Sequence, residues 1–317
     1  MKVFITDFIK SYSIEKKILG NHLIIDNKFK HKAEVLLVWH QKIDKAYIKD
    51  FKNLKYVVRY GTGYDDIDLK TLNKNNILFS NNPEYGTYEV CNTSLAMIMN
   101  ISRSISQYNE VSKSSNKPIW QDNFIKEIKS TSNTKVGIIG AGRIGSTLIN
   151  KLNYIGFETL FYDPYKSHGY EKIINSNRVN DLGELLRSSD IISINCDLNK
   201  ETHKLIDKKF ISKMKKGSSL VNTARGKIIS NLDDFYMPLK KKLINSISLD
   251  VLPEEPPLKS KLINAWKNNE KWLNGRVIIN PHTAFYSKHS FKNMREQAAF
   301  NALNYINNKK LKNLVNK

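Results

Sequence analysis

Three charged side chains in the second half of the chain have the chemistry needed to transfer a proton and to bind an anion. Arg225 lies in VNTARG, Glu255 in LDVLPEEP and His282 in INPHTAF, at or near the ends of predicted strands. A histidine can act as general acid or base because the ordinary pKa of imidazole lies near neutrality. An arginine can hold a carboxylate in a forked contact and polarise a neighbouring oxygen. A glutamate can orient the imidazole through its second nitrogen.

Each of these residues also has a purely structural interpretation. A histidine at the end of a strand is usually a polar loop residue, Arg225 could cap or pair with a neighbour, and Glu254 could take the place of Glu255. Spacing alone does not bring the three together. If they do converge, the set suits the oxidation of a 2-hydroxy acid, or its reverse. The histidine would take the hydroxyl proton, the arginine would hold the carboxylate, and C2 would lose a hydride.

A glycine-rich stretch, GIIGAGRIG at residues 137–145, predicts a binding site for the dinucleotide that accepts such a hydride. An apolar strand pattern precedes it and a helical pattern follows, which is the context that makes a GxGxxG motif informative. The first glycine makes the tight turn, the second lets the backbone approach a pyrophosphate, and the third lets the helix pack on the strand. The diphosphate would lie at the helix N-terminus. The predicted contacts are Gly140, Gly142, Arg143, Ile144 and Gly145.

The acid that follows the next predicted strand indicates which dinucleotide binds. Asp163 lies 18 residues after Gly145. A carboxylate there accepts hydrogen bonds from the adenosine ribose and repels a 2′-phosphate, which predicts NAD over NADP. Lys166 is the nearby residue that would favour the phosphorylated cofactor.

Short apolar runs that alternate with helical patterns predict an α/β protein with two parallel, doubly wound sheets. The predicted strands are 2–6, 35–39, 56–59 and 77–79 in the first series, and 135–139, 160–162, 191–195, 219–222, 246–249 and 276–279 in the second. One long helix is predicted over 87–109 and another over 287–308. Pro238 interrupts a helical pattern at 232–242, where we expect the helix to break.

The composition argues against several other classes of protein. No apolar run approaches the roughly 20 residues of a membrane span, and the first residues, MKVFITDFIK, predict a strand rather than a signal peptide. Cys91 and Cys196 fit no metal motif, so we expect a reduced, cytoplasmic protein without a metal. The net charge of +21 comes from scattered lysines without a nucleic-acid motif, so neither nucleic acid nor membrane is an expected partner.

Taken together, these stretches resemble the D-isomer-specific 2-hydroxyacid dehydrogenases along nearly the whole chain, and within them the C-terminal-binding-protein-like branch. The matching blocks are RYGTGYDDID (59–68), NNPEYGTYEV (81–90), GIIGAGRIG (137–145), FYDPY (161–165), KKGSSLVNTARG (215–226), LDVLPEEPP (249–257) and PHTAFYS (281–287). The resemblance implies a Rossmann NAD domain, at 101–287, inserted into a flavodoxin-like substrate domain, at 1–100 plus 288–317. It also implies an active site in the cleft between them and a homodimer joined through the NAD domains.

The resemblance assigns further site residues. Arg225, Glu255 and His282 match the catalytic set, and the acid directly before Pro256 favours Glu255 over Glu254. Residues that match cofactor contacts are Ser94, Cys196, Leu198, Thr223, Ala224 and Asp250. Residues that match the substrate site are Arg59, Tyr60, Gly61 and Thr62, whose turn would hold the substrate carboxylate, and Phe285, which stands where corepressors of the branch carry Trp.

Two other functions are compatible with the same residues. An NAD-sensing corepressor-like protein would keep the catalytic set but would bind peptide motifs in an external groove, and this chain lacks the long tails of such proteins. A phosphite-type dehydrogenase would use the same three residues. Formate dehydrogenases of the superfamily pair the histidine with Gln, whereas an acid is present here.

Overall fold

The computed structural model describes residues 1–7, 9–117 and 119–316, and its chain divides into two compact units. The first unit comprises residues 1–87 and 285–317, and the second comprises 88–284. The predicted division at 100 and 287 therefore differs from the observed one, and residue 317 lies outside the described residues. The difference arises because helix α4 (Thr87–Arg103) belongs almost entirely to the second unit, while nothing in its composition marks its start as a boundary.

The first unit contains a parallel five-stranded sheet in the order β2-β1-β3-β4-β5, the flavodoxin-like order. Successive side chains of a strand face opposite sides, so Val35 and Leu37 enter one core while Leu36 and Val38 enter the other. Helices α1 and α12 cover the first face, and α2 and α3 cover the second. The bounds are β1 Val3–Ile5, β2 Leu23–Ile24, β3 Val35–Val38, β4 Tyr56–Arg59, β5 Leu78–Ser80, α1 Ser13–Leu19, α2 Lys45–Ile48, α3 Leu69–Lys74 and α12 Lys288–Ile306.

A buried ion pair ties the C-terminal helix to the N-terminal part of this unit. Arg295 of α12 pairs with Glu15 of α1, and the hydroxyl of Tyr60, at the end of β4, donates to the same carboxylate at 2.9 Å. Burial opposes the charge on Arg295, but the contact with Glu15 raises its pKa overall. Removing one member of such a pair leaves a buried charge without its partner, so this contact keeps α12 in the first unit.

The second unit contains a parallel seven-stranded sheet in the order β12-β11-β10-β9-β6-β7-β8. The chain starts in the middle, at β6, and builds outward on both sides, so the order reverses next to β6. Ligands of such sheets bind at this reversal, beyond the carboxyl ends of the strands. The strands are β6 Lys135–Ile139, β7 Glu158–Tyr162, β8 Asn177–Arg178, β9 Ile191–Ile194, β10 Ser218–Asn222, β11 Ile244–Leu249 and β12 Val277–Ile279.

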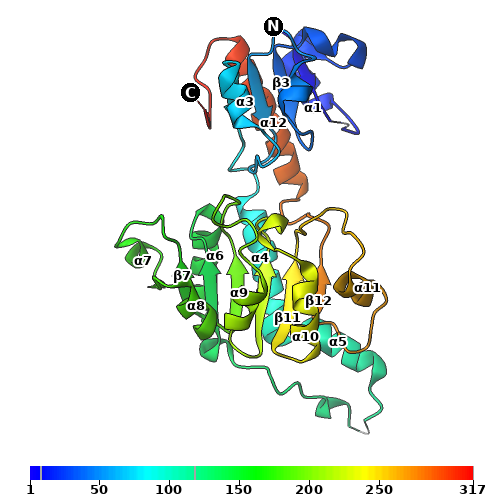
Figure 1. Ribbon diagram of the computed structural model, residues 1–317, viewed down its shortest axis with the longest axis vertical. Coiled ribbons are helices and arrows are strands. Elements are labelled where there is room, and N and C mark those ends of the chain that lie inside the picture. The colour runs from blue at the N-terminus through cyan, green and yellow to red at the C-terminus, as the bar shows by residue number, and fades with distance from the viewer. Residues whose placement is uncertain (8, 118, 317) are drawn as a thin grey trace. The chain divides into compact units, whose positions relative to one another are not determined.

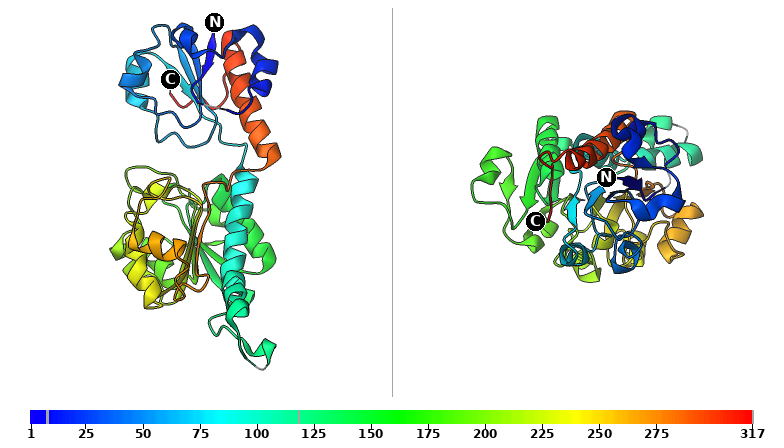
Figure 2. Two further views of the ribbon diagram at one scale, coloured as in Figure 1. Left: turned by 90° about the vertical axis from the view of Figure 1, so that its right-hand side faces the viewer. Right: turned by 90° about the horizontal axis from the view of Figure 1, so that it is seen from above.

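Helices cover both faces of this second sheet. Apolar residues of α4 and α6 fill the core on one face, and those of α8, α9 and α10 fill the core on the other. Figure 2 shows the cyan α4 and the yellow segment that holds α10 on opposite sides of the strands. The remaining helices of the unit are α5 Ile105–Ser114, α6 Arg143–Ile155, α7 Tyr170–Ile173, α8 Leu182–Ser188, α9 Lys208–Lys213, α10 Tyr236–Lys240 and α11 Lys261–Lys267 (Figure 1).

The predicted fold class, two parallel α/β sheets, is confirmed, and three details differ. The strands β2 and β8 were not predicted. The predicted helix over 87–109 is two helices, because Ser104 adopts a left-handed conformation with φ of 49°. The predicted break at Pro238 lies two residues earlier: a 3-10 helix over Leu232–Phe235 ends where α10 begins at Tyr236. The proline therefore lies in the first turn of α10, where no backbone donor is lost.

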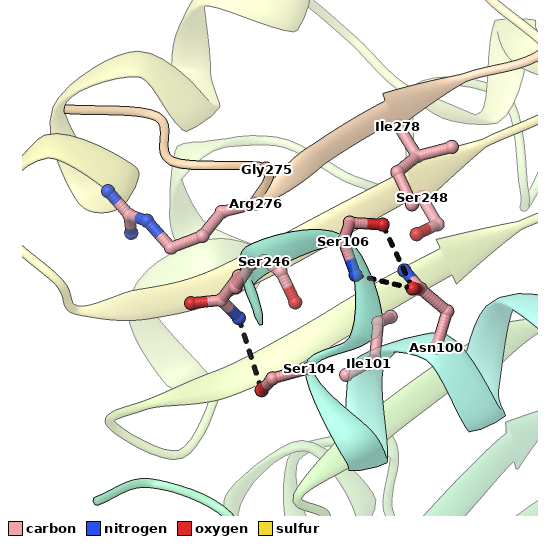
Figure 3. A pocket seen from close by; sticks show the side chains of 10 residues that line it. Asn100, Ile101, Ser104, Ser106, Ser246, Ser248, Gly275, Arg276 and Ile278 are labelled. Carbon is pink, nitrogen blue, oxygen red and sulfur yellow. Dashed lines mark hydrogen bonds between the residues drawn. The ribbon is translucent and has the colours of Figure 1, made fainter. Parts of the chain in front are cut away.

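A small cavity lies in the second unit between the break of α4 and the strands β11 and β12 (Figure 3). Its volume is about 10 Å³ and its lining includes Asn100, Ser104 and Ser246. That volume holds a single water molecule and no organic ligand. Across the described part of the chain, no helix has both the length and the apolar character needed to cross a membrane.

Candidate functional site

The glycine-rich turn joins β6 to α6, and two of its glycines are required by the protein itself. Gly140 has φ of +89°, and a Cβ there would lie 2.5 Å from the backbone nitrogen of Cys196. A Cβ on Gly145 would lie 2.0 Å from the carbonyl oxygen of Gly140. Both distances are too short for real contacts, so any side chain would push the turn away from β9 or the helix away from the turn. The sequence predicted a tight turn at Gly140 and close packing of the helix at Gly145.

Gly142 differs from its neighbours because a Cβ there would meet no atom within 4 Å. The described protein atoms therefore give no reason for a glycine at this position. Gly142 is the N-cap of α6 and, having no side chain, makes no capping hydrogen bond. The first amides of α6 have no partner within the helix. Open space before a helix N-terminus suits a pyrophosphate, whose charge the helix dipole favours. The exposed Arg143 and the partly buried Ile144 begin this helix.

Asp163 directly follows β7 and its carboxylate faces the glycine-rich turn. One carboxylate oxygen accepts a hydrogen bond from the Ala141 amide at 2.9 Å, and the other accepts from the Tyr165 amide at 3.0 Å. A carboxylate has lone pairs beyond these two bonds. The residue is therefore fixed beside the turn with acceptor capacity for ribose hydroxyls, and turn, helix end and carboxylate together fit a dinucleotide.

The other predicted cofactor contacts lie along the carboxyl ends of β9 and β10. Cys196 packs its backbone against Gly140, and burial raises the pKa of its thiol to about 12, so the thiol is neutral. Thr223, just after β10, shares a 2.6 Å hydrogen bond with Ser94 of α4, and both are buried. Leu198 and Ala224 are partly buried against the core of this face. These contacts position the residues within the second unit.

His282 and Glu255 come together at the end of the sheet. The imidazole Nδ1 lies 2.7 Å from Glu255 Oε2, and the other oxygen of Glu255 accepts from the Leu252 amide at 2.9 Å. Burial alone would raise the pKa of Glu255. The hydrogen bonds from His282 and from the Leu252 amide, with the positive charges of His282 and Arg225, outweigh burial and lower that pKa. The structure therefore places an ionised Glu255, rather than Glu254, against the imidazole.

The chain beyond β12 is shaped so that the imidazole is presented rather than buried. His282 has φ of +54°, and its amide donates to the Asp250 carbonyl at 2.8 Å. Its side chain keeps 47% of its surface exposed. A left-handed conformation is costly for a residue with a Cβ and is found where the surrounding structure enforces it, often at functional sites.

Asp250 follows β11 and holds the backbone of the histidine loop. Its carboxylate accepts from the amides of Thr283 and Ala284, each at 3.0 Å, and the side chain is almost fully buried. Burial raises the pKa of Asp250, and the hydrogen bonds from the two amides only partly offset this effect. The structure thus gives Asp250 the task of supporting the loop, while a contact with the nicotinamide carboxamide stays a prediction.

Arg225 is carried by a rigid loop that packs on the Glu255 segment. Asn222, the last residue of β10, accepts from the Ala224 amide and donates to the Arg225 carbonyl, both at 3.0 Å. A Cβ on Gly226 would lie 1.8 Å from the Leu252 carbonyl oxygen, so only glycine allows this approach. Leu252 also donates to Glu255, and the two loops are therefore locked together. Neither Asn222 nor Gly226 was predicted as a site residue, although the NTARG context holds both.

The predicted substrate residues lie in the first unit. The Arg59 side chain donates to the Gly63 carbonyl at 2.6 Å, and Thr62 donates through its hydroxyl to the Asn82 carbonyl at 3.1 Å. The Gly61 carbonyl accepts from the Asn82 amide at 3.1 Å. Phe285 packs edge-on against Tyr85 with ring centroids 6.0 Å apart.

Tyr60 does not have the surface expected of a ligand-binding side chain. Its side chain is fully buried in the core of the first unit, its hydroxyl donates to Glu15, and its amide donates to the Val38 carbonyl at 2.8 Å. The predicted substrate-binding role therefore does not fit the Tyr60 side chain or its amide. The match of the whole motif concealed this because a tyrosine beside glycines looks the same in sequence whether it points to the core or to solvent.

Comparison with known proteins identifies the family. Residues 95–284 match the model of the D-isomer specific 2-hydroxyacid dehydrogenase, NAD binding domain. A glyoxylate reductase of Thermofilum pendens (strain DSM 2475 / Hrk 5) is 30% identical over 288 residues, covering 90% of this chain and 82% of the relative.

Solved structures show the same architecture. The D-lactate dehydrogenase of Aquifex aeolicus, in complex with NAD and lactic acid, has a TM-score of 0.82 and 26% identity, covering 97% of this chain and 96% of that one. The D-mandelate dehydrogenase of Rhodotorula graminis has a TM-score of 0.84 at 22% identity, covering 100% of this chain and 98% of that one, and so shares the fold.

The chain therefore belongs to the D-isomer-specific 2-hydroxyacid dehydrogenase family, and its region 95–284 is the NAD-binding domain of that family. It is an NAD-dependent oxidoreductase. The narrower assignment to the C-terminal-binding-protein-like branch stays a prediction.

Proposed function

We propose that this enzyme transfers a hydride between NAD and C2 of a small 2-oxo or 2-hydroxy carboxylic acid of D configuration, with His282 as the general acid and base. Bound NAD supplies the hydride donor or acceptor. The observation that supports the role of His282 is its 2.7 Å contact with the carboxylate of Glu255, which leaves Nε2 as the ring nitrogen for the substrate. In the reductive direction Nε2 gives a proton to the oxygen on C2, and in the oxidative direction it takes that proton back.

Glu255 and Arg225 have distinct roles in this proposal. The lowered pKa of Glu255 keeps its carboxylate ionised, so it orients the ring and stabilises the imidazolium that forms when His282 takes a proton. Arg225 binds the substrate carboxylate and polarises the C2 oxygen, as a guanidinium suits a forked contact with an anion. The turn at 59–63, without the Tyr60 side chain, is proposed to receive the carboxylate as well, with Phe285 beside the substrate.

Cofactor binding follows from the turn and the carboxylate described above. We assign the pyrophosphate to the amides at Gly142, Arg143 and Ile144, and the adenosine ribose to Asp163, which favours NAD over NADP. We assign the nicotinamide half to the ends of β9 and β10, where Cys196, Leu198, Thr223 and Ala224 lie, with Ser94 behind Thr223.

We also propose that the enzyme is a homodimer joined through its second unit. Large apolar side chains are exposed along the segment that follows the break of α4, with Trp120 59% and Phe124 76% exposed. Figure 1 shows this segment leaving the body of the second unit before it returns to β6. Apolar residues gathered on one projecting segment are typical of an association surface.

A cytoplasmic location is proposed as well, supported by the free thiols at Cys91 and Cys196.

The test is a screen of 2-oxo acids for the consumption of NADH by the purified enzyme. The panel begins with glyoxylate and pyruvate, since relatives are named a glyoxylate reductase and a D-lactate dehydrogenase, and extends to larger and phosphorylated oxo acids. Phosphite with NAD serves as the arm for the alternative reaction. We expect at least one oxo acid to oxidise NADH and to yield the D-hydroxy acid. The proposal fails if NADH binds but no member of the panel consumes it, or if phosphite alone reduces NAD.

A further inference from the structure

The loop that follows β7 carries Asp163 and is held by one side chain from the edge strand β8. Arg178 donates through Nη2 to the Ser167 carbonyl at 2.7 Å. Through Nη1 it donates to the carbonyls of Lys166, at 3.2 Å, and of Asp163, at 3.5 Å. One guanidinium thus supplies donors to three carbonyls of the loop. Two of these carbonyls, those of Asp163 and Ser167, also accept longer bonds from the Lys166 amide at 3.4 Å and the Tyr170 amide at 3.3 Å.

The guanidinium itself is fixed from two further sides. Its Nε donates to Glu171 at 2.9 Å, and the second oxygen of Glu171 accepts from the Gly169 amide at 2.9 Å. Its Cζ atom lies 5.0 Å from the ring centroid of Phe161, a fully buried residue of β7. The amides of Glu171 and Gly169 and the charge of Arg178 lower the pKa of Glu171 to about 2, with its own amide contributing most. Arg178 keeps only 11% of its side-chain surface exposed.

The position of Asp163 depends on this arrangement. Its carboxylate bonds the Ala141 amide in the glycine-rich turn, and the Arg178 donors hold the loop just beyond it. Without Arg178 the Lys166 carbonyl would lose its donor, and the Asp163 and Ser167 carbonyls would keep only the long bonds from the Lys166 and Tyr170 amides. The loop could then shift, and the carboxylate would lose its fixed geometry beside the turn. Because Arg178 donates to Glu171 and to three carbonyls of the loop, its positive charge is used within the loop.

We propose that Arg178 is a positioning residue for cofactor recognition: by holding the loop at residues 163–169, it sets the affinity for the adenosine half of NAD and the preference for NAD over its 2′-phosphorylated form. This inference concerns dinucleotide binding and does not depend on which oxo acid the enzyme reduces. Binding of ADP-ribose therefore tests it independently of the proposed reaction.

The experiment measures binding of ADP-ribose and of 2′-phospho-ADP-ribose by calorimetry to the wild-type enzyme and to Arg178→Met. We expect the Kd for ADP-ribose to rise at least ~10-fold, the scale of losing hydrogen bonds from a charged donor. The Kd for the phosphorylated probe should change less, so the ratio of the Kd for 2′-phospho-ADP-ribose to the Kd for ADP-ribose falls. In an assay that varies NADH at a saturating concentration of the oxo acid, KM for NADH should rise while kcat stays within about twofold, since the loop does not touch the reacting carbon.

Two further variants separate positioning from simple charge. Arg178→Lys keeps the charge but lacks the planar fork, so it should remain defective. Arg187→Met removes a surface arginine whose partner, Asp181, is also exposed, and should bind both probes like the wild type. Thermal melting without nucleotide shows whether each variant is folded.

Glu171→Gln provides a milder change if Arg178→Met does not fold. It removes the anionic partner and keeps the guanidinium, so the phosphorylated probe should bind more tightly relative to ADP-ribose. The proposal is overturned if folded Arg178→Met binds ADP-ribose within about twofold of wild type, if Arg178→Lys restores wild-type binding, or if Glu171→Gln leaves the ratio of the two probes unchanged.

Discussion

At the scale of the residue, the proposed function depends on His282, whose imidazole is oriented by the carboxylate of Glu255. Nδ1 of His282 is taken by Glu255, and Glu255 is itself held by the Leu252 amide. A ring fixed at one nitrogen can present the other in one direction only. This is why the neighbouring Glu254, of the same type and charge, cannot replace Glu255 without moving the loop.

Glu255→Gln is expected to lower kcat at least ~10-fold, because the neutral amide cannot stabilise the imidazolium. The folded pKa of Glu255 is lowered, so its charge is complete above the ordinary glutamate range and is lost only as the pH falls through that lowered value. The deficit of the variant should therefore be present throughout the range from about pH 6 to pH 9, where the wild-type carboxylate is charged. Steady-state kcat across that range measures it.

Glu254→Gln is the matched control for this change, since it removes the same charge one residue away. It should keep wild-type kcat. A Glu255→Gln enzyme as active as Glu254→Gln, or a deficit present only for Glu254→Gln, would contradict the assignment of Glu255.

The residues proposed to carry out the chemistry could be singled out from the sequence, whereas those that support them could not. Arg225, Glu255 and His282 belong to types and contexts that indicate chemistry, and the second unit brings Glu255 and His282 together. Asn222 and Gly226 carry no such signal, because an amide that bridges its own loop and a glycine pressed on a carbonyl are defined by neighbours distant in sequence. Tyr60 shows the opposite error: it was predicted to bind substrate, but its side chain is buried in the core, and that burial too depends on neighbours distant in sequence.

At the scale of the element, apolar runs predicted the strands that have two covered faces. The strands β2 and β8 are two residues long and lie at sheet edges, so they lack a hydrophobic pattern. The break of α4 at Ser104 was also hidden. It lies where the carbonyl of Ser106 approaches Gly275, whose added Cβ would come within 2.6 Å of it. Because β8 was not predicted, its residue Arg178 was not identified as the side chain that we infer to position the cofactor loop.

At the scale of the whole molecule, the chain forms two units, and the second contains the residues proposed to bind NAD and the His282–Glu255 pair. The final helix α12 returns to the first unit, where Arg295 pairs with Glu15. The sequence could predict the insertion of one domain into another through resemblance. The boundary residues could not be predicted, because the boundary between Thr87 and Tyr88 falls inside the continuous block at 81–90.

The proposed homodimer gives a prediction at this scale. Light scattering after size-exclusion chromatography should give a mass about twice the 36.6 kDa of the chain. Lysine at both Trp120 and Phe124 should shift the mass toward the monomer, since charges on an apolar association surface oppose burial. Tyr154→Lys is the control, because Tyr154 is 95% exposed elsewhere on the second unit. A wild-type monomer, or a Trp120 and Phe124 variant that stays dimeric, would contradict the proposed surface.

The central claim is that His282 moves the proton that accompanies hydride transfer, and its most direct test is the kcat of His282→Ala with the best oxo acid of the panel. NADH binding is measured in parallel by fluorescence. We predict a loss in kcat of at least ~100-fold, the usual scale for a general acid or base, with the Kd for NADH within about twofold of wild type. A His282→Ala enzyme that binds NADH and turns over at the wild-type rate would contradict it.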